Sequence, residues 1–217
     1  MILNVSVTEY RHSVTAHEVG LTRDTHTVSR LREQYVPSWF STPNQWQWKA
    51  DLAANRGFQW YVDKYTEVTT SEPWNDVDLF FQRLARVGAR SARVGPLLYT
   101  LRYPILNAAS MASAAEALAG WFCETHYNWD LITRPQRVSP DMVFHDSRSG
   151  RLALVEVKST GRSGSVRSKV TGEMIKLLRV LAITKQLRPR PYYVALIMVQ
   201  VAGPTDVALS SLVLEEV

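Results

Sequence analysis

The sequence predicts an α/β fold, a β-sheet flanked by helices, and three observations in the second half of the chain indicate it. Two apolar runs separated by a polar turn predict a β-hairpin within residues 139–160. Apolar residues at helical spacing before and after this hairpin predict helices over 111–127 and 173–187. The apolar run at 192–201 predicts a final strand.

The predicted hairpin turns at residues 146–150, which are rich in turn formers, and its second strand covers 152–158. Side chains alternate across a strand, so each face of 152–158 carries every second residue. One face carries Leu152, Leu154, Glu156 and Lys158, and the other carries Ala153, Val155 and Val157. Because both faces are apolar before Glu156, we expect a strand buried on both sides that exposes Glu156 and Lys158 where it leaves the core.

A carboxylate also opens the first strand of this hairpin. Asp141 begins that strand, and antiparallel pairing would place it beside the exit end of the second strand. Mg²⁺ prefers oxygen ligands and is usually held by one or two carboxylates, with water and phosphate oxygens completing its shell. We therefore expect Asp141 and Glu156, with the backbone carbonyl of Val157, to bind Mg²⁺, for which Mn²⁺ would substitute. Lys158 would orient an attacking water or stabilise charge on a phosphate. The alternative is that Glu156 and Lys158 form an exposed ion pair of little energetic value.

The Pro140-Asp141 pair and the Glu156-Val157-Lys158 triplet resemble the two halves of the signature of the PD-(D/E)XK nuclease superfamily. The resemblance implies a restriction-endonuclease-like core of order αβββαβ over residues 110–217, with a mixed central sheet flanked by helices. In that order the first strand is the short segment 131–133. The resemblance also implies a Mg²⁺-dependent DNA endonuclease of the restriction, junction-resolving, transposition or repair kind.

Glu116 is a further candidate for the catalytic site. Many members of the superfamily that this chain resembles carry an acidic residue on the first core helix, facing the metal, and Glu116 lies on the corresponding predicted helix. The alternative is a capping box, in which Ser113 begins the helix and Glu116 bonds back to a backbone N–H.

A basic segment follows the proposed site. Residues 161–169 are rich in Gly, Ser and basic side chains and are predicted to form a flexible loop. Lys and Arg contacts to phosphates supply much of the affinity for nucleic acid without reading its sequence. We therefore expect Arg162, Arg167 and Lys169, with Lys176 on the helix behind them, to bind nucleic acid, although such a loop can also be a plain solvated connector.

Residues 1–109 differ in character and are predicted to form a mainly helical, aromatic-rich region packed on the core. Alternation predicts a strand over 1–10, and helical spacing predicts helices over 44–68 and 75–87. The aromatic residues of this region include Trp39, Trp46, Trp48, Trp60 and Trp74. They would form a core or a dimer interface, or else a platform on which unpaired bases stack.

Composition excludes several classes of protein. The net charge of +5 suits a binder of polyanions, although many other proteins share it. Cys123 is the single cysteine, which excludes a disulfide framework and a cysteine-based zinc site, and it is expected to be a buried thiol. Signal-peptide layout and apolar runs of bilayer length are absent, so we expect a cytoplasmic location, no membrane contact and no small-molecule cofactor.

Two other functions stay open at this stage. The chain could be a non-catalytic nucleic-acid-binding or interaction protein built on a nuclease fold, or a nuclease directed at RNA. If the substrate is duplex DNA, we expect a homodimer, because cutting both strands most simply takes two sites related by a two-fold axis.

Overall fold

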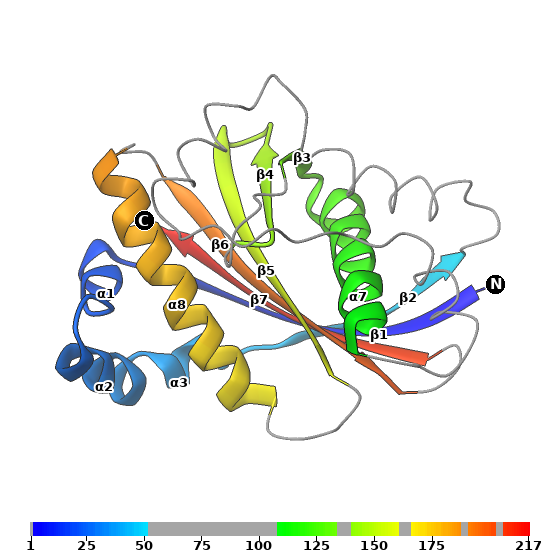
Figure 1. Cartoon of the computed structure of the whole chain (residues 1–217), viewed down its shortest axis with the longest axis horizontal. Helices are drawn as coiled ribbons and strands as arrows, with labels where there is room; N and C mark the ends of the chain where they lie inside the picture. Colours follow the sequence, from blue (N-terminus) through cyan, green and yellow to red (C-terminus); the bar gives the residue numbers. More distant parts are fainter. Residues whose placement is uncertain (1, 52–107, 134–139, 161–165, 188–190, 203–205) are drawn as a thin grey trace.

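A computed structural model of the chain describes residues 2–51, 108–133, 140–160, 166–187, 191–202 and 206–217 (Figure 1). Its strands form one seven-stranded sheet in the order β2-β1-β7-β6-β5-β4-β3. The strands are β1 (Ile2–Val14), β2 (Asn44–Asp51), β3 (Asp130–Thr133), β4 (Met142–Asp146), β5 (Arg151–Thr160), β6 (Tyr192–Val201) and β7 (Asp206–Glu216). The pairs β1–β7 and β5–β6 are parallel and the other neighbours are antiparallel, so the sheet is mixed.

Helices cover both faces of this sheet, and the strands pass between them in Figure 1. One face packs against α7 (Ala108–Phe122), which continues into the short π-helix η3 (Cys123–Tyr127). The other face packs against α8 (Val166–Leu187) together with α1 (Ala16–Gly20), α2 (Thr25–Gln34) and α3 (Val36–Trp39). The α/β class, with a mixed sheet flanked by helices, is therefore confirmed.

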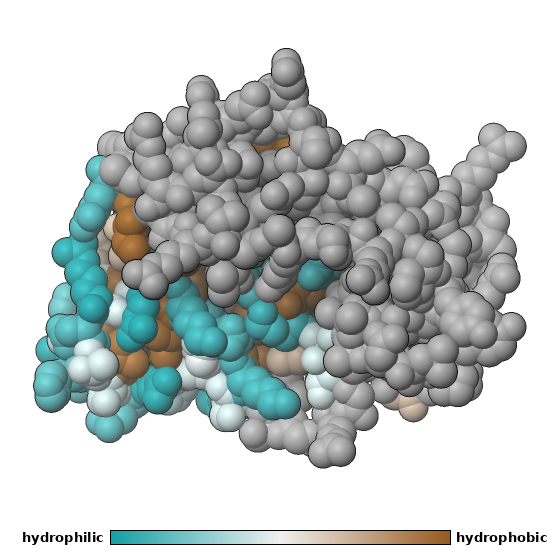
Figure 2. All heavy atoms as spheres, in the orientation of Figure 1, coloured by the Kyte–Doolittle hydropathy of each residue, from teal (hydrophilic) through white to brown (hydrophobic). Residues whose placement is uncertain are grey.

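The outer surface of α8 and of α1–α3 is mainly hydrophilic. Figure 2 shows polar residues over this part of the molecule, with apolar atoms visible between them. This pattern is expected of amphipathic helices that bury one stripe against a sheet. No helix in the described ranges is long and apolar enough to cross a membrane.

The elements predicted for the second half of the chain agree closely with the structure. The strand predicted at 192–201 is β6, and the predicted hairpin is β4 and β5. The predicted start of the second helix is wrong, because α8 begins at Val166 and includes part of the segment predicted to be a loop. Cys123 is buried, as expected, and burial raises the pKa of its thiol well above the ordinary value.

Two strands come from the N-terminal region. The strand predicted over 1–10 is β1, which extends to Val14 and lies between β2 and β7. The helix predicted over 44–68 is wrong over its first eight residues, which form β2. In β2 Trp46, Trp48 and Ala50 face the core while the residues between them are exposed, a period of two that selects a strand. The remainder of that predicted helix and the helix predicted over 75–87 lie outside the described residues.

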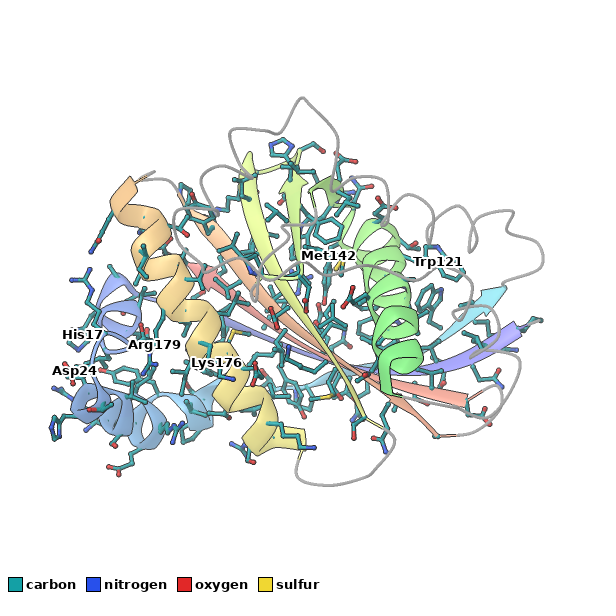
Figure 3. The ribbon with its side chains drawn as sticks, viewed as in Figure 1. His17, Asp24, Trp121, Met142, Lys176 and Arg179 are labelled. Carbon is teal, nitrogen blue, oxygen red and sulfur yellow. The ribbon has the colours of Figure 1, made fainter. Side chains whose placement is uncertain are left out.

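The described tryptophans of this region belong to the core. Trp39 is fully buried among α1–α3 and α8. Trp48 contacts Trp121 of α7 edge to face, with ring centroids 4.9 Å apart, and Figure 3 shows Trp121 on the side of α7 that faces β2. Trp46 stacks on Phe122 at 6.3 Å. These rings therefore pack in the core on either face of the sheet. Trp60 and Trp74 lie outside the described residues.

We predict that β1 contributes to the stability of the whole sheet. Leu3 is 1% exposed and packs in the same core as α7, whereas its neighbour Ile2 is 50% exposed. Leu3→Ala should lower the free energy of unfolding by about 2–4 kcal/mol, because it leaves a cavity, and Ile2→Ala should change it by less than about 0.5 kcal/mol. Urea denaturation measures both. A transition that is unchanged in Leu3→Ala would show that β1 is not part of the cooperative unit.

Candidate active site

The register of β4 on β5 brings Asp141 beside Glu156. Met142 pairs with Val155 in this antiparallel ladder, so the preceding residue, Asp141, lies opposite Glu156. Directly opposed residues of antiparallel strands have Cβ atoms about 5 Å apart. The convergence predicted from the sequence is therefore present in the structure.

Asp141 also ends the ladder. Its Oδ2 accepts a hydrogen bond of 2.8 Å from the backbone N–H of Val157. In a continued ladder this N–H would bond to a backbone carbonyl of the neighbouring strand. Because β4 begins only at Met142, the Asp141 carboxylate accepts the bond instead. This bond holds the Asp141 side chain against the end of β5, where Asp141 is 3% exposed and Glu156 is 2% exposed.

Lys158 lies on the same face as Glu156 and ion-pairs with it. Leu154, two residues before Glu156, packs against α8, so alternation places both charged side chains on the α8 side of the sheet. The Lys158 ammonium contacts Oε1 of Glu156 and lies 3.9 Å from Oε2 of Glu173, on α8. Because Glu156 is buried, this is not the exposed ion pair of the alternative interpretation.

Glu173 was not predicted as a site residue. Its other oxygen accepts a hydrogen bond of 2.6 Å from Lys176 Nζ, three residues later on α8. The spacing of Glu173 and Lys176 is visible in the sequence, but the contact with Lys158 depends on how α8 packs on the sheet.

A tight turn sets the register of the hairpin. The Asp146 carboxylate accepts hydrogen bonds from the backbone N–H of Arg148 and from Ser149 Oγ, at 3.0 Å and 2.6 Å. Burial alone would raise the pKa of Asp146, but these hydrogen bonds outweigh it and lower the pKa below its ordinary value. Gly150 closes the turn with a φ of 70°, in the left-handed region that favours glycine.

Glu116 comes from a different element than the other three predicted catalytic residues. It lies on α7, which packs on the face opposite to the one that carries Glu156 and Lys158. The capping-box alternative is also wrong, because α7 begins at Ala108 and Glu116 lies well inside it. The spacing of acidic residues along the chain does not indicate which face of the sheet this helix covers.

The predicted nucleic-acid-binding residues divide into three groups. Arg162 lies outside the described residues. Arg167 and Lys169 are exposed on the first turns of α8 rather than in a loop. Lys176 is exposed and paired with Glu173, and Figure 3 shows it on α8 near Arg179. Arg179 itself donates a hydrogen bond of 2.7 Å to the carbonyl oxygen of Thr22, which ties α8 to the end of α1.

The donor set suits a hard divalent cation. Asp141 and Glu156 present carboxylates on adjacent strands, and one or two carboxylates are what Mg²⁺ usually takes from a protein. Groups of three or more His, Cys, Asp and Glu side chains that could hold a metal are absent among the described residues. A site built from the described residues would therefore rely on water and substrate oxygens to complete the coordination.

Comparison with known proteins found no matching family model, no matching curated protein and no matching solved structure.

We predict that Mg²⁺ stabilises the folded chain through these carboxylates. At about 100 times its dissociation constant, Mg²⁺ should add about 2.7 kcal/mol of stability and raise Tm by roughly 5–10 °C. Asp141→Asn should remove most of this rise, because it removes an anionic ligand while keeping an acceptor for Val157. Asp206→Asn changes an exposed carboxylate at the start of β7 and keeps an acceptor for Asn4, so its Tm should still rise with Mg²⁺. Differential scanning calorimetry with and without Mg²⁺ measures the shift, and an equal shift in Asp141→Asn would contradict the assignment.

Proposed function

We propose that this protein is a Mg²⁺-dependent endonuclease that hydrolyses phosphodiester bonds of DNA on a restriction-endonuclease-like core. One observation carries the proposal: the hairpin register sets Asp141 opposite Glu156, with Lys158 on the same face two residues later. The order α7-β3-β4-β5-α8-β6 also matches the αβββαβ order of the superfamily whose signature these residues resemble.

Each residue has a separate task in this proposal. Asp141 and Glu156 would hold Mg²⁺, which when bound lowers the pKa of a water and polarises the phosphate. Lys158 would place its ammonium at the reacting phosphate and stabilise the charge that develops there. Glu173 lies 3.9 Å from the Lys158 ammonium. It would therefore keep Lys158 in position when Glu156 turns toward the cation.

We predict cleavage that depends on the metal and on Asp141. Changing a group that only supports a metal ligand typically lowers affinity or activity 10–100-fold, so Asp141→Ala should lower the cleavage rate more than about a hundredfold. Ca²⁺ should support DNA binding without cleavage, because it tolerates loose coordination. A gel assay with plasmid, linear, single-stranded and branched DNA, and with RNA, measures both activity and substrate class.

The control for this assay is Asp206→Asn, which changes an exposed carboxylate at the start of β7 and should still cleave. Full cleavage in excess EDTA would contradict the metal requirement. Binding without cleavage of any substrate in Mg²⁺ or Mn²⁺ would favour a non-catalytic nucleic-acid-binding protein. A homodimer stays the expectation for cutting both strands of a duplex, and light scattering of the protein with and without DNA measures it.

We predict that Lys158 and the basic start of α8 act on different steps. Lys158→Ala should lower the chemical rate about a hundredfold with little change in DNA affinity, because its charge acts at the reacting phosphate. Replacing Arg167 and Lys169 with Ala should instead weaken binding. It should also reduce the dependence of log affinity on log salt by up to about 0.9 per lost phosphate contact.

A matched control removes two charges elsewhere. Arg148 lies in the turn at the far end of β5, and Arg23 lies by the C-terminal part of α8, beside Ala182 and Lys185. Replacing Arg148 and Arg23 with Ala should leave the salt dependence within error. If both double variants lower the salt dependence of binding equally, the start of α8 is not a specific phosphate contact. Salt-dependent binding isotherms, measured in Ca²⁺, decide between these outcomes.

A further inference from the structure

A pocket opens on the α8 face of the sheet, beside the candidate active site. Its volume is about 330 Å³. Its lining includes two aromatic rings, two hydroxyls, an amide and a guanidinium, from Tyr10, Phe40, Thr8, Ser210, Gln45 and Arg167. These residues come from β1, β2, β7, the end of α3 and the start of α8. None of the roles proposed for the site uses this pocket as a whole.

The strand register fixes the distance from this pocket to Lys158. Lys158 pairs with Met198, Met198 with Ser210, and Ser210 with Thr8, so these four residues form one row across β5, β6, β7 and β1. Neighbouring strands lie about 4.8 Å apart, which sets Ser210 about 10 Å from Lys158 along the row. Met198, which lies between them in this row, is 3% exposed in the cluster that α8 covers, so a substrate strand would join the two places over the surface of α8 and not along the row.

The pocket is chemically mixed in a way that suits a nucleotide. Phe40 and Tyr10 pack edge to face, with centroids 5.2 Å apart, and form an apolar wall. The guanidinium carbon of Arg167 lies 4.8 Å from the centroid of Phe40, which keeps this cation at the pocket while its charge stays available to a phosphate. Thr8, Ser210 and Gln45 supply hydroxyl and amide groups, which can donate and accept hydrogen bonds to a base or sugar.

We propose that this pocket binds a single unpaired nucleotide of the substrate strand, within a few positions of the bond that is cleaved. The volume lies at the lower end of the range for ligand pockets, so it suits one nucleotide and not a base pair. The enzyme would therefore act on a strand with a base that is single-stranded, frayed or flipped from the duplex, and such bases are held by contact with aromatic side chains and by hydrogen bonds to their edges. This inference rests on the proposed nuclease function for the position of the cleaved bond.

Two variants of β1 provide a matched test. Thr8 and Ser6 lie on the same face of the same strand, but only Thr8 lines the pocket. Thr8→Phe would fill the pocket, and Ser6→Phe would add the same ring outside it. The probe is a fluorescently labelled 12-nucleotide single strand, with anisotropy measured in Ca²⁺. Thr8→Phe should weaken binding about tenfold and Ser6→Phe less than twofold, with thermal melts confirming that both variants fold.

An abasic scan of the same strand tests whether the pocket holds a base. One abasic position should weaken binding to the wild-type protein by about tenfold, and the same position should cause less than a twofold loss in Thr8→Phe, because the pocket is already filled. When the wild-type protein cleaves the intact strand in Mg²⁺, the cut should fall within a few nucleotides of that position. A free deoxynucleoside monophosphate should compete only weakly.

Several outcomes would overturn the inference. Equal binding by Thr8→Phe and Ser6→Phe, or a loss at the abasic position that is as large in Thr8→Phe as in the wild type, would show that the pocket holds no base. A flat abasic scan with tight binding of the free monophosphate, lost in Thr8→Phe, would assign the pocket to a free nucleotide instead. If the abasic position weakens binding to the wild type but not to Thr8→Phe, and no strand is cleaved in Mg²⁺ or Mn²⁺, the proposed nuclease function is wrong and the nucleotide pocket is supported.

Discussion

The antiparallel register of β4 on β5 is the constraint on which the candidate site depends. A slip of one residue would move Asp141 to the opposite face of the sheet from Glu156, because side chains alternate with a period of two. The register is held at one end by the hydrogen-bonded turn at Asp146 and Gly150. At the other end it is held by the bond from Val157 N–H to Asp141. The hydrogen bond at Asp141 and the hydrogen bonds of the turn therefore favour the same register.

Placing two carboxylates at a buried strand end has an energetic cost that the surrounding charges reduce. Burial disfavours a charged carboxylate, and a second negative charge nearby disfavours it further. Lys158 offsets part of this cost for Glu156, and Glu173 places a further carboxylate near the same ammonium. Lys158 therefore lies between the carboxylates of β5 and α8.

The N-terminal strands enlarge the sheet beyond the order αβββαβ and build the pocket. β1 runs parallel to β7, and its Thr8 lies beside Ser210. On the other face, Tyr127 shares a hydrogen bond of 2.6 Å with Ser211, which joins η3 to β7. Burial raises the pKa of Tyr127 well above its ordinary value, so its phenol stays neutral in this bond. β7 is thus joined to η3 on one face of the sheet and lines the pocket with β1 on the other.

The sequence by itself determined the local elements and the spacing of the chemistry. Apolar periodicity located β6 at its observed bounds, and the alternation within β5 put Glu156 and Lys158 on one face. Only the tertiary structure decided which segments contact each other, because contacts between segments far apart in the chain produce no local periodicity in the sequence. It made residues 44–51 an edge strand on β1 and placed Glu116 on the opposite face from Glu156. It also brought Arg167 to Phe40 across more than half of the chain, which is why the pocket had no signature in the sequence.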